Sequence, residues 1–187
     1  MSAAPRADVV ICAYTLQRWD QLVQAVDSAL AQQPAPQQVV VVVDHNDELL
    51  ERAERTWGGH ERVSVVANHR RAGLSGARNT GVSVCTSEVV AFLDDDATAR
   101  PGWLAALLAP YDDPAVMAVG GAAAPVWPAG RVPDLLPQEL WWVVGCTYAG
   151  HPTQLGDVRN VLGASMSFRR QVFDVVGGFD ELVGRVA

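Results

Sequence analysis

The sequence predicts an α/β fold in which a mostly parallel, Rossmann-like central sheet carries helices on both faces. Short β-branched runs alternate along the chain with segments whose apolar residues recur at helical spacing. This strand–helix order favours parallel strands joined by right-handed crossovers. With 187 residues, of which 49% are hydrophobic and 19% charged, the chain is expected to form one domain with a substantial core.

The first elements are the clearest. Val9–Ala13 is typical of a strand buried on both faces, and the five valines of Val39–Val43 indicate a central parallel strand. Between them the apolar residues of Leu16–Leu30 follow the helical period, and Pro34 ends that helix. These segments predict a first strand–helix–strand unit.

The same alternation continues to about residue 120. Further helices are expected over Asp47–Trp57, Ser75–Val84 with Ser75 as its cap, and Pro101–Leu108, and further strands over Val63–Val66, Val89–Leu93 and Val116–Gly120. The remainder is less regular, with a strand expected within Val161–Phe168 and a short helix that ends at Gly177. Ligands of such sheets bind at the carboxyl ends of the strands, so residues that follow each strand are candidates for a site.

Composition excludes several classes of protein. A net charge of −7 argues against a general nucleic-acid binder, which needs a basic face. No apolar run approaches the ~18–20 residues of a membrane span, and the first residues lack the apolar stretch of a secretory signal. Three widely spaced cysteines, Cys12, Cys85 and Cys146, are typical of reduced thiols. A cytoplasmic protein is therefore expected.

Three consecutive aspartates, Asp94, Asp95 and Asp96, follow the strand predicted over Val89–Leu93. Their mutual repulsion calls for a compensating cation, and carboxylate oxygens suit Mg²⁺ or Mn²⁺ with a bound diphosphate. Alternation along an extended chain lets Asp94 and Asp96 face one ligand while Asp95 points away. The alternative is a solvated acidic turn ahead of a helix.

Two more polar segments follow strands. Asp44, His45 and Asn46 carry groups that recognise a nucleobase or ribose, although Asn46 or Asp47 can instead cap the next helix. Residues 70–79 combine arginines and glycines with a helix N-terminus, which suits a diphosphate or ribose. The alternative is a charged surface loop, and the segment lacks the lysine element of a P-loop.

Together these segments resemble glycosyltransferase family 2, whose members have the GT-A fold and use nucleotide sugars. The resemblance covers nearly the whole chain and rests on residues 9–15, 41–46, 73–79, the Asp-x-Asp element within 90–96, and residues 163–170 and 177–181. It implies a transferase that moves a sugar, with inversion, from a nucleoside-diphosphate sugar to a hydroxyl or phosphate of a sugar or lipid-linked acceptor. Peripheral association with the inner face of a membrane fits such an acceptor.

The resemblance also implies roles for individual residues. Nucleotide-sugar contacts are expected from Ala13, Tyr14, Asp44, His45, Arg78, Asp94 and Asp95. Asp96 would ligate Mn²⁺ or Mg²⁺. Acceptor-side contacts are expected from Trp142, Gly163, Ala164 and Ser165.

The family also implies a division of the chain. Residues 1–187 are expected to form a single GT-A domain that is truncated at its C-terminus, with 1–120 as the nucleotide-sugar-binding half and 121–187 as the start of the acceptor-side half. The general base of family members lies beyond the segment that corresponds to Gly177–Glu181. Two alternatives remain: a donor-binding fragment without turnover, and a sugar nucleotidyltransferase.

Overall fold

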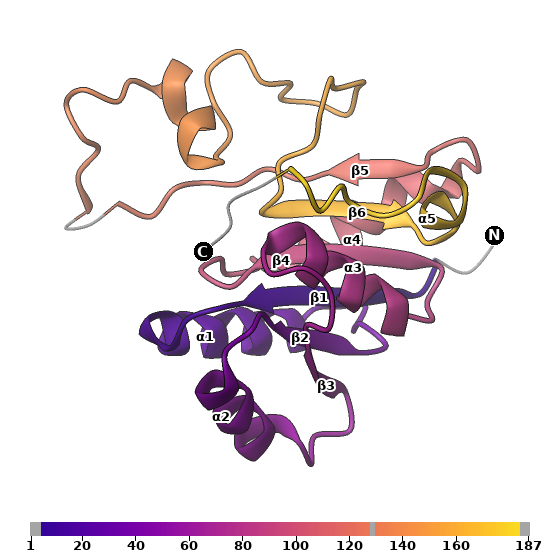
Figure 1. The fold of residues 1–187 in the computed structure, drawn as a ribbon. Coiled ribbons are helices and arrows are strands. Elements are labelled where there is room, and N and C mark those ends of the chain that lie inside the picture. Colours follow the sequence, from indigo (N-terminus) through magenta and orange to yellow (C-terminus); the bar gives the residue numbers. More distant parts are fainter. Residues whose placement is uncertain (1–4, 128–129, 184–187) are drawn as a thin grey trace.

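A six-stranded sheet forms the centre of the molecule (Figure 1). The computed structural model describes residues 5–127 and 130–183. In this part of the chain the strand order is β3-β2-β1-β4-β6-β5. The strands are β1 (Ala7–Ala13), β2 (Val39–Val43), β3 (Val63–Ala67), β4 (Val89–Asp94), β5 (Ala118–Gly120) and β6 (Ser165–Arg169).

The sheet is mostly parallel, as predicted. β1 pairs in parallel with β2 and β4, and β2 pairs in parallel with β3. β6 runs antiparallel to both of its neighbours, β4 and β5. Its start therefore lies beside the carboxyl end of β4, where Ser165 is paired with Leu93. This reversal brings a segment from late in the chain to the edge where the parallel strands end.

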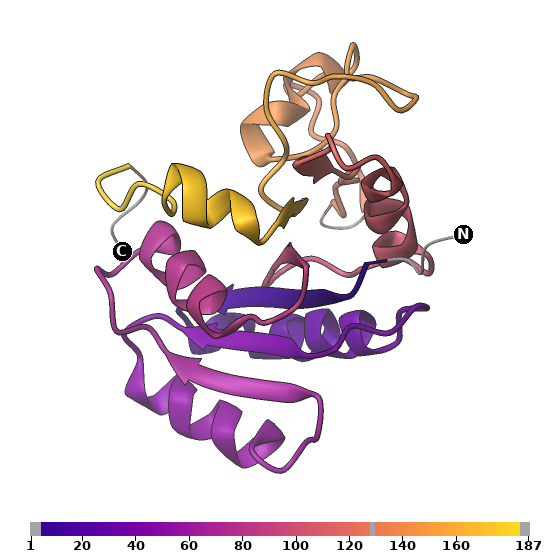
Figure 2. The ribbon, with the colours of Figure 1, turned by 90° about the vertical axis from the view of Figure 1, so that its right-hand side faces the viewer.

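Helices cover both faces of the sheet, which confirms the predicted architecture (Figure 2). The α-helices are α1 (Trp19–Leu30), α2 (Asp47–Trp57), α3 (Leu74–Val84), α4 (Trp103–Leu108) and α5 (Gln171–Val176). Shorter 3₁₀ turns are η1 (Leu16–Arg18), η2 (Ala109–Asp112) and η4 (Gln138–Val144). Side chains from α1, α2 and α4 pack on one face, and those from α3 and α5 on the other.

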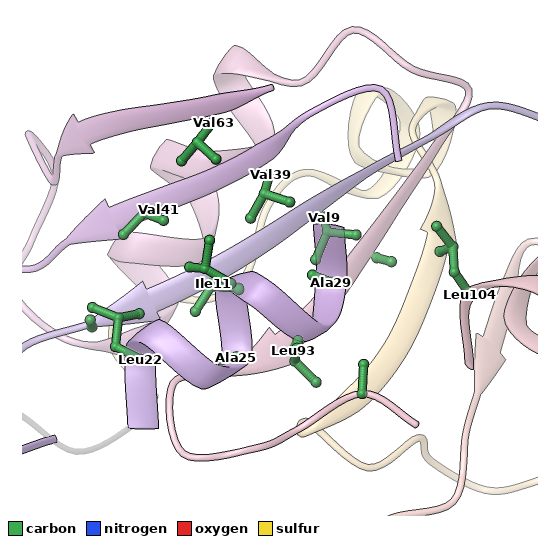
Figure 3. Packing of buried hydrophobic residues seen from close by; sticks show 14 of the residues in the cluster. Val9, Ile11, Leu22, Ala25, Ala29, Val39, Val41, Val63, Leu93 and Leu104 are labelled. Atoms are coloured by element: carbon green, nitrogen blue, oxygen red, sulfur yellow. The ribbon is translucent and has the colours of Figure 1, made fainter. Parts of the chain in front are cut away.

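The central strands are buried on both faces, because their side chains alternate between two clusters. Val9 and Ile11 point toward α1, where they join Leu22 and Ala25 (Figure 3). Val10 points the other way, toward α3. All five residues of β2 are buried, as a run of valines predicts. The packed strands give the carboxyl edge a rigid support.

Several boundaries differ from the predictions. The helix expected from Leu16 begins with the turn η1, so α1 starts at Trp19. The predicted cap at Ser75 is wrong: α3 begins at Leu74, and Gly73 occupies the cap position with a φ of 123°. Ser75 Oγ instead donates to the carbonyl of Val183. Pro101 lies in a turn before α4.

The segment between β5 and β6 departs from the sheet in a long excursion (orange in Figure 1). η4 is its longest regular element among the described residues. Strands expected from Val116 and Val161 begin later, at Ala118 and Ser165. Within residues 5–127 and 130–183, no helix has both the length and the apolar character needed to cross a bilayer.

Candidate functional site

The carboxyl ends of β1, β2 and β4 bring three predicted residues to one edge of the sheet. Cys12 of β1 is paired with Asp94 of β4, and the next residue, Ala13, is paired with Val43 of β2. The backbone N–H of Asp44 then donates to the carbonyl of Ala13 over 2.8 Å. Ala13, Asp44 and Asp94 therefore lie side by side, although they are far apart in sequence.

Two arginines offset part of the negative charge of the acidic triplet. Arg78 Nη2 lies 3.5 Å from Asp94 Oδ1. Arg18 Nη1 lies 3.1 Å from both Asp95 Oδ1 and Asp96 Oδ2. These pairs supply two of the three positive charges that would balance three adjacent carboxylates, which leaves a charge for a bound cation to balance.

Burial distinguishes the three carboxylates. Asp95 is buried, and its Oδ2 has no hydrogen-bond partner among the described residues. Burial raises the pKa of Asp95 to about 6, although the positive charge of Arg18 lowers it. Burial also raises the pKa of Asp94, against the opposing charge of Arg78. The side chains of Asp94 and Asp96 remain 36% and 41% exposed, so a ligand can reach them.

The acidic triplet fits a hard divalent cation that shares its coordination with a ligand. Carboxylate oxygens are the donors that Mg²⁺ and Mn²⁺ prefer, and the unpaired Oδ2 of Asp95 leaves negative charge uncompensated there. No three His, Cys, Asp or Glu side chains among the described residues are arranged to hold a metal ion by themselves. The chain therefore offers part of a coordination shell, which a diphosphate can complete.

Asp44 organises the loop between β3 and α3. Its Oδ1 accepts from Asn68 Nδ2 over 2.6 Å, and its Oδ2 accepts from the backbone N–H of Gly73 over 2.8 Å. His45 Nδ1 lies 2.8 Å from the same Oδ1, and His45 has a φ of 50°. Asp44 thus fixes the start of α3 from the end of β2.

Asn46 caps the next helix, as the second interpretation of this segment predicted. Its Oδ1 accepts from the backbone N–H of Leu49 over 3.0 Å. Its Nδ2 donates to the carbonyl of Tyr14 over 3.1 Å. Tyr14 is exposed at the end of β1. The cap therefore also fixes the backbone beside a predicted nucleotide contact.

Arg78 links the two halves of the chain. Its Nη2 donates to the carbonyl of Gly163 over 3.2 Å as well as pairing with Asp94. Its guanidinium lies 5.8 Å from the ring centroid of Phe92 and 5.5 Å from that of Phe179. The side chain is only 13% exposed, so these contacts hold Arg78 in place.

The acceptor-side candidates are divided between two segments. Gly163 and Ala164 precede β6, whereas Ser165 is buried and its Oγ accepts from Trp103 Nε1 over 2.9 Å. Trp142 lies in η4 and is more than half exposed. Burial and the charge of Asp96 raise the pKa of Cys146, just after η4, so this turn lies within electrostatic reach of the triplet.

Sequence reasoning missed three contributors. Arg18 was not singled out because its pairing with the triplet depends on how η1 meets β4. Asn68 follows β3, so the strand-end rule that selected Asp44 points to it too. Asn79 Nδ2 donates to the Phe179 carbonyl over 2.8 Å and to Glu181 Oε1 over 2.9 Å, which fastens the last described segment to α3.

A polar hollow lies at the opposite edge of the sheet, where β4 begins and β6 ends. None of the predicted site residues lines it. Its lining consists of Thr86, Ser87, Glu88, Arg169, Arg170 and Gln171.

A family model described as glycosyl transferase family 2 matches residues 8–177. The chain belongs to this family. The match confirms the resemblance that the sequence motifs indicated, and it covers the strands that carry Asp44 and Asp94 as well as the β6 segment.

Among curated proteins, this family 2 chain is 39% identical over 181 residues to a glucosyl-dolichyl phosphate glucuronosyltransferase of Haloferax volcanii. The alignment covers 96% of this chain and 58% of that protein. A pre-mycofactocin glycosyltransferase of Mycobacterium tuberculosis is 40% identical over 80 residues, covering 43% of this chain and 17% of that protein. The chain thus spans little more than half the length of the Haloferax relative.

Solved structures confirm the GT-A type of fold. A Pyrobaculum calidifontis mannosyltransferase in complex with GDP-Man and Mn²⁺ superposes with a TM-score of 0.69 at 21% identity, covering 99% of this chain and 50% of that chain. GalNAc-T7 with UDP, GalNAc and Mn²⁺ gives a TM-score of 0.67 at 22% identity, covering 97% of this chain and 38% of that chain. Both structures share the fold of this chain over nearly its whole length.

Proposed function

We propose that the chain transfers a sugar from a nucleoside-diphosphate sugar to an acceptor hydroxyl or phosphate. The observation that carries this proposal is the meeting of Asp44, Arg78 and the triplet Asp94–Asp96 at the carboxyl edge of the sheet. Carboxylates that suit a divalent cation stand there beside two guanidinium groups that suit phosphate oxygens. Family membership supports the same reaction class.

In the donor site that we propose, different predicted residues contact the nucleotide, the sugar and the diphosphate. Ala13 and Tyr14 line the nucleotide, and Asp44 with His45 contacts the base. Asp94 contacts ribose or sugar, with Arg78 close to the diphosphate, whereas buried Asp95 contributes to donor binding through its ion pair with Arg18. Support comes from their shared edge and from the fixed position of Arg78.

Asp96 is the residue that we propose as the metal ligand, with the exposed face of its carboxylate toward the donor. A bound Mn²⁺ or Mg²⁺ supplies Lewis-acid stabilisation of the leaving diphosphate. Two structural neighbours were crystallised with Mn²⁺, which supports a divalent ion here. Arg78 adds a fixed positive charge close to the developing negative charge.

The acceptor that we propose is a sugar or a lipid-linked phosphate, contacted by residues 121–187, while residues 1–120 hold the donor. The Haloferax relative acts, by its name, on a glucosyl-dolichyl phosphate. Exposed apolar residues of η4, Leu140, Trp142 and Val143, suit contact with the inner face of a membrane. We propose inversion, because direct attack on the anomeric carbon opposite the diphosphate inverts it.

A product assay tests the proposed function. The chain is incubated with Mn²⁺, with each of several UDP- and GDP-sugars, and with a polyprenyl-phosphate acceptor or its sugar-linked form. Mass spectrometry should detect a product one sugar heavier. Donor binding without product supports the donor-binding alternative. Release of pyrophosphate from a nucleoside triphosphate and a sugar phosphate supports a nucleotidyltransferase instead.

A further inference from the structure

Arg18 is a cation that reaches the acidic edge from a different element than the aspartates. It ends η1, directly after β1, and Thr15 Oγ1 accepts from the Gln17 N–H at the start of that turn. Its Nη1 lies 3.1 Å from Asp95 Oδ1 and 3.1 Å from Asp96 Oδ2. One guanidinium nitrogen therefore bridges a buried carboxylate and an exposed one.

The two arginines at this edge differ in freedom. Arg78 is 13% exposed and is held by a carbonyl and two aromatic rings. Arg18 is 38% exposed, and besides the two carboxylates it has the ring of Tyr14, whose centroid is 5.8 Å away. Because little packing holds its guanidinium, Arg18 can change partners while Arg78 stays in place.

The two partners of Arg18 also differ. Asp95 is buried with one oxygen unpaired among the described residues, so removal of Arg18 would leave an uncompensated buried charge, which is costly. The side chain of Asp96 is 41% exposed, so water or another cation replaces Arg18 there at little cost. The bond to Asp96 is therefore the one that can be exchanged.

We propose that Arg18 is a positioning residue. Its guanidinium is paired with Asp96 while the donor is absent, and this pair breaks when a nucleoside diphosphate binds. Throughout the exchange Arg18 retains Asp95. This inference rests on the proposed function, because it takes Asp96 as the metal ligand.

The charge of Arg18 should affect the binding of a divalent cation at Asp96. A guanidinium beside Asp96 repels a divalent cation and competes with it for the same carboxylate. A diphosphate attracts the guanidinium through paired N–H groups and so removes the competitor. By linkage, Mn²⁺ and a nucleoside diphosphate must then bind cooperatively, and the coupling must depend on residue 18.

The test measures Mn²⁺ affinity directly, from the electron paramagnetic resonance signal of the free ion, without nucleotide and with saturating UDP or GDP. Wild type is compared with Arg18→Gln. Removal of one adjacent positive charge should tighten nucleotide-free Mn²⁺ binding about tenfold and reduce the gain that UDP or GDP produces. Arg55→Gln removes the same charge from α2, where Arg55 is 70% exposed and pairs with Glu51, and should behave like wild type.

Arg18→Lys provides a second comparison. Lysine keeps the positive charge but lacks the paired N–H groups, so nucleotide-free Mn²⁺ affinity should stay within about twofold while the gain with nucleotide falls. This variant decides the question if Arg18→Gln does not fold.

Two results would overturn the inference, and a third would contradict the proposed function. Unchanged or weaker Mn²⁺ binding by folded Arg18→Gln overturns the inference and leaves Arg18 as a structural brace. An unchanged gain with nucleotide in Arg18→Lys also overturns it. Failure of the wild type to bind Mn²⁺ with any nucleoside diphosphate instead contradicts the proposed function itself.

Discussion

Asp44 serves the fold and the proposed site at once. Its two carboxylate oxygens accept from Asn68 and from the N–H of Gly73, so they join the end of β2 to the start of α3. The side chain is only 9% exposed, and any base that it contacts must share these oxygens. Its substitution should therefore affect both nucleotide binding and stability.

We expect Asp44→Ala to weaken UDP or GDP binding by about 1–3 kcal/mol, the usual effect of removing a buried hydrogen-bond partner. Thermal unfolding should also occur at a lower temperature, because Asn68 and Gly73 lose their acceptor. Calorimetric titration and a melting curve measure the two effects. Asn68→Ala is the control, since it loosens the same loop but leaves the carboxylate. Equal loss of nucleotide affinity in both variants would indicate that Asp44 acts only through the loop.

Cys12 lies at the same edge of the sheet, where it is paired with Asp94. Burial, with the nearby charge of Asp94, raises the pKa of Cys12 to about 12, although the charge of Arg78 lowers it. A raised thiol pKa means that the reactive thiolate is scarce below that pH. Cys12 is partly exposed, so the scarcity of its thiolate should make it react slowly with iodoacetamide at pH 8–9 in the folded protein and faster once the protein is unfolded. Mass spectrometry of the labelled peptide compares the folded and unfolded protein, and equally fast labelling of Cys12 in both would contradict the raised pKa.

Elements were predicted best where local pattern and tertiary environment agree. Both ends of β2 were predicted correctly, because five consecutive valines strongly favour a buried strand. The start of α3 was missed, because its cap position is determined by Asp44 from another strand rather than by Ser75. The residues around Ser75 give no sign of this contact with Asp44, which is distant in the sequence.

The excursion between β5 and β6 was equally beyond prediction from sequence. It lacks a sustained period, and η4 follows no capping signal. The role of Gly163 there comes from Arg78, whose Nη2 donates to its carbonyl. The pairing of Arg18 with Asp95 and Asp96 was missed for the same reason: it depends on the approach of η1 to the end of β4.

The contact between α3 and the segment after α5 gives a prediction for these elements. Asn79 Oδ1 accepts from the Phe179 N–H over 2.7 Å, and its Nδ2 donates to Glu181. Asn79→Ala should speed hydrogen exchange at the Phe179 amide at least tenfold, since that amide loses its acceptor. Exposed Asn160→Ala serves as the control. Unchanged exchange at Phe179 would show that other contacts hold the segment.

For the molecule as a whole, the order of strands and helices was predictable, and so was the edge at which the candidate residues gather. The alternation of strand and helix patterns implied the parallel sheet, and the sheet implied that Asp44 and Asp94 lie at the same edge. A strand within Val161–Phe168 was predicted, but the antiparallel direction of β6 was not. It brings residues 163–165 to the donor edge, which joins the two halves of the chain in one proposed site.

The central claim is that a metal–nucleotide complex binds at the carboxyl edge of the sheet. Paramagnetic broadening of backbone amide signals by Mn²⁺, added with UDP or GDP, locates the complex directly. We expect broadening around Ala13, Asp44 and Asp94–Asp96, little effect around the polar hollow at Thr86 and Gln171, and loss of the broadening in Asp96→Ala. Broadening centred on the hollow, or broadening that persists unchanged in folded Asp96→Ala, would contradict the account.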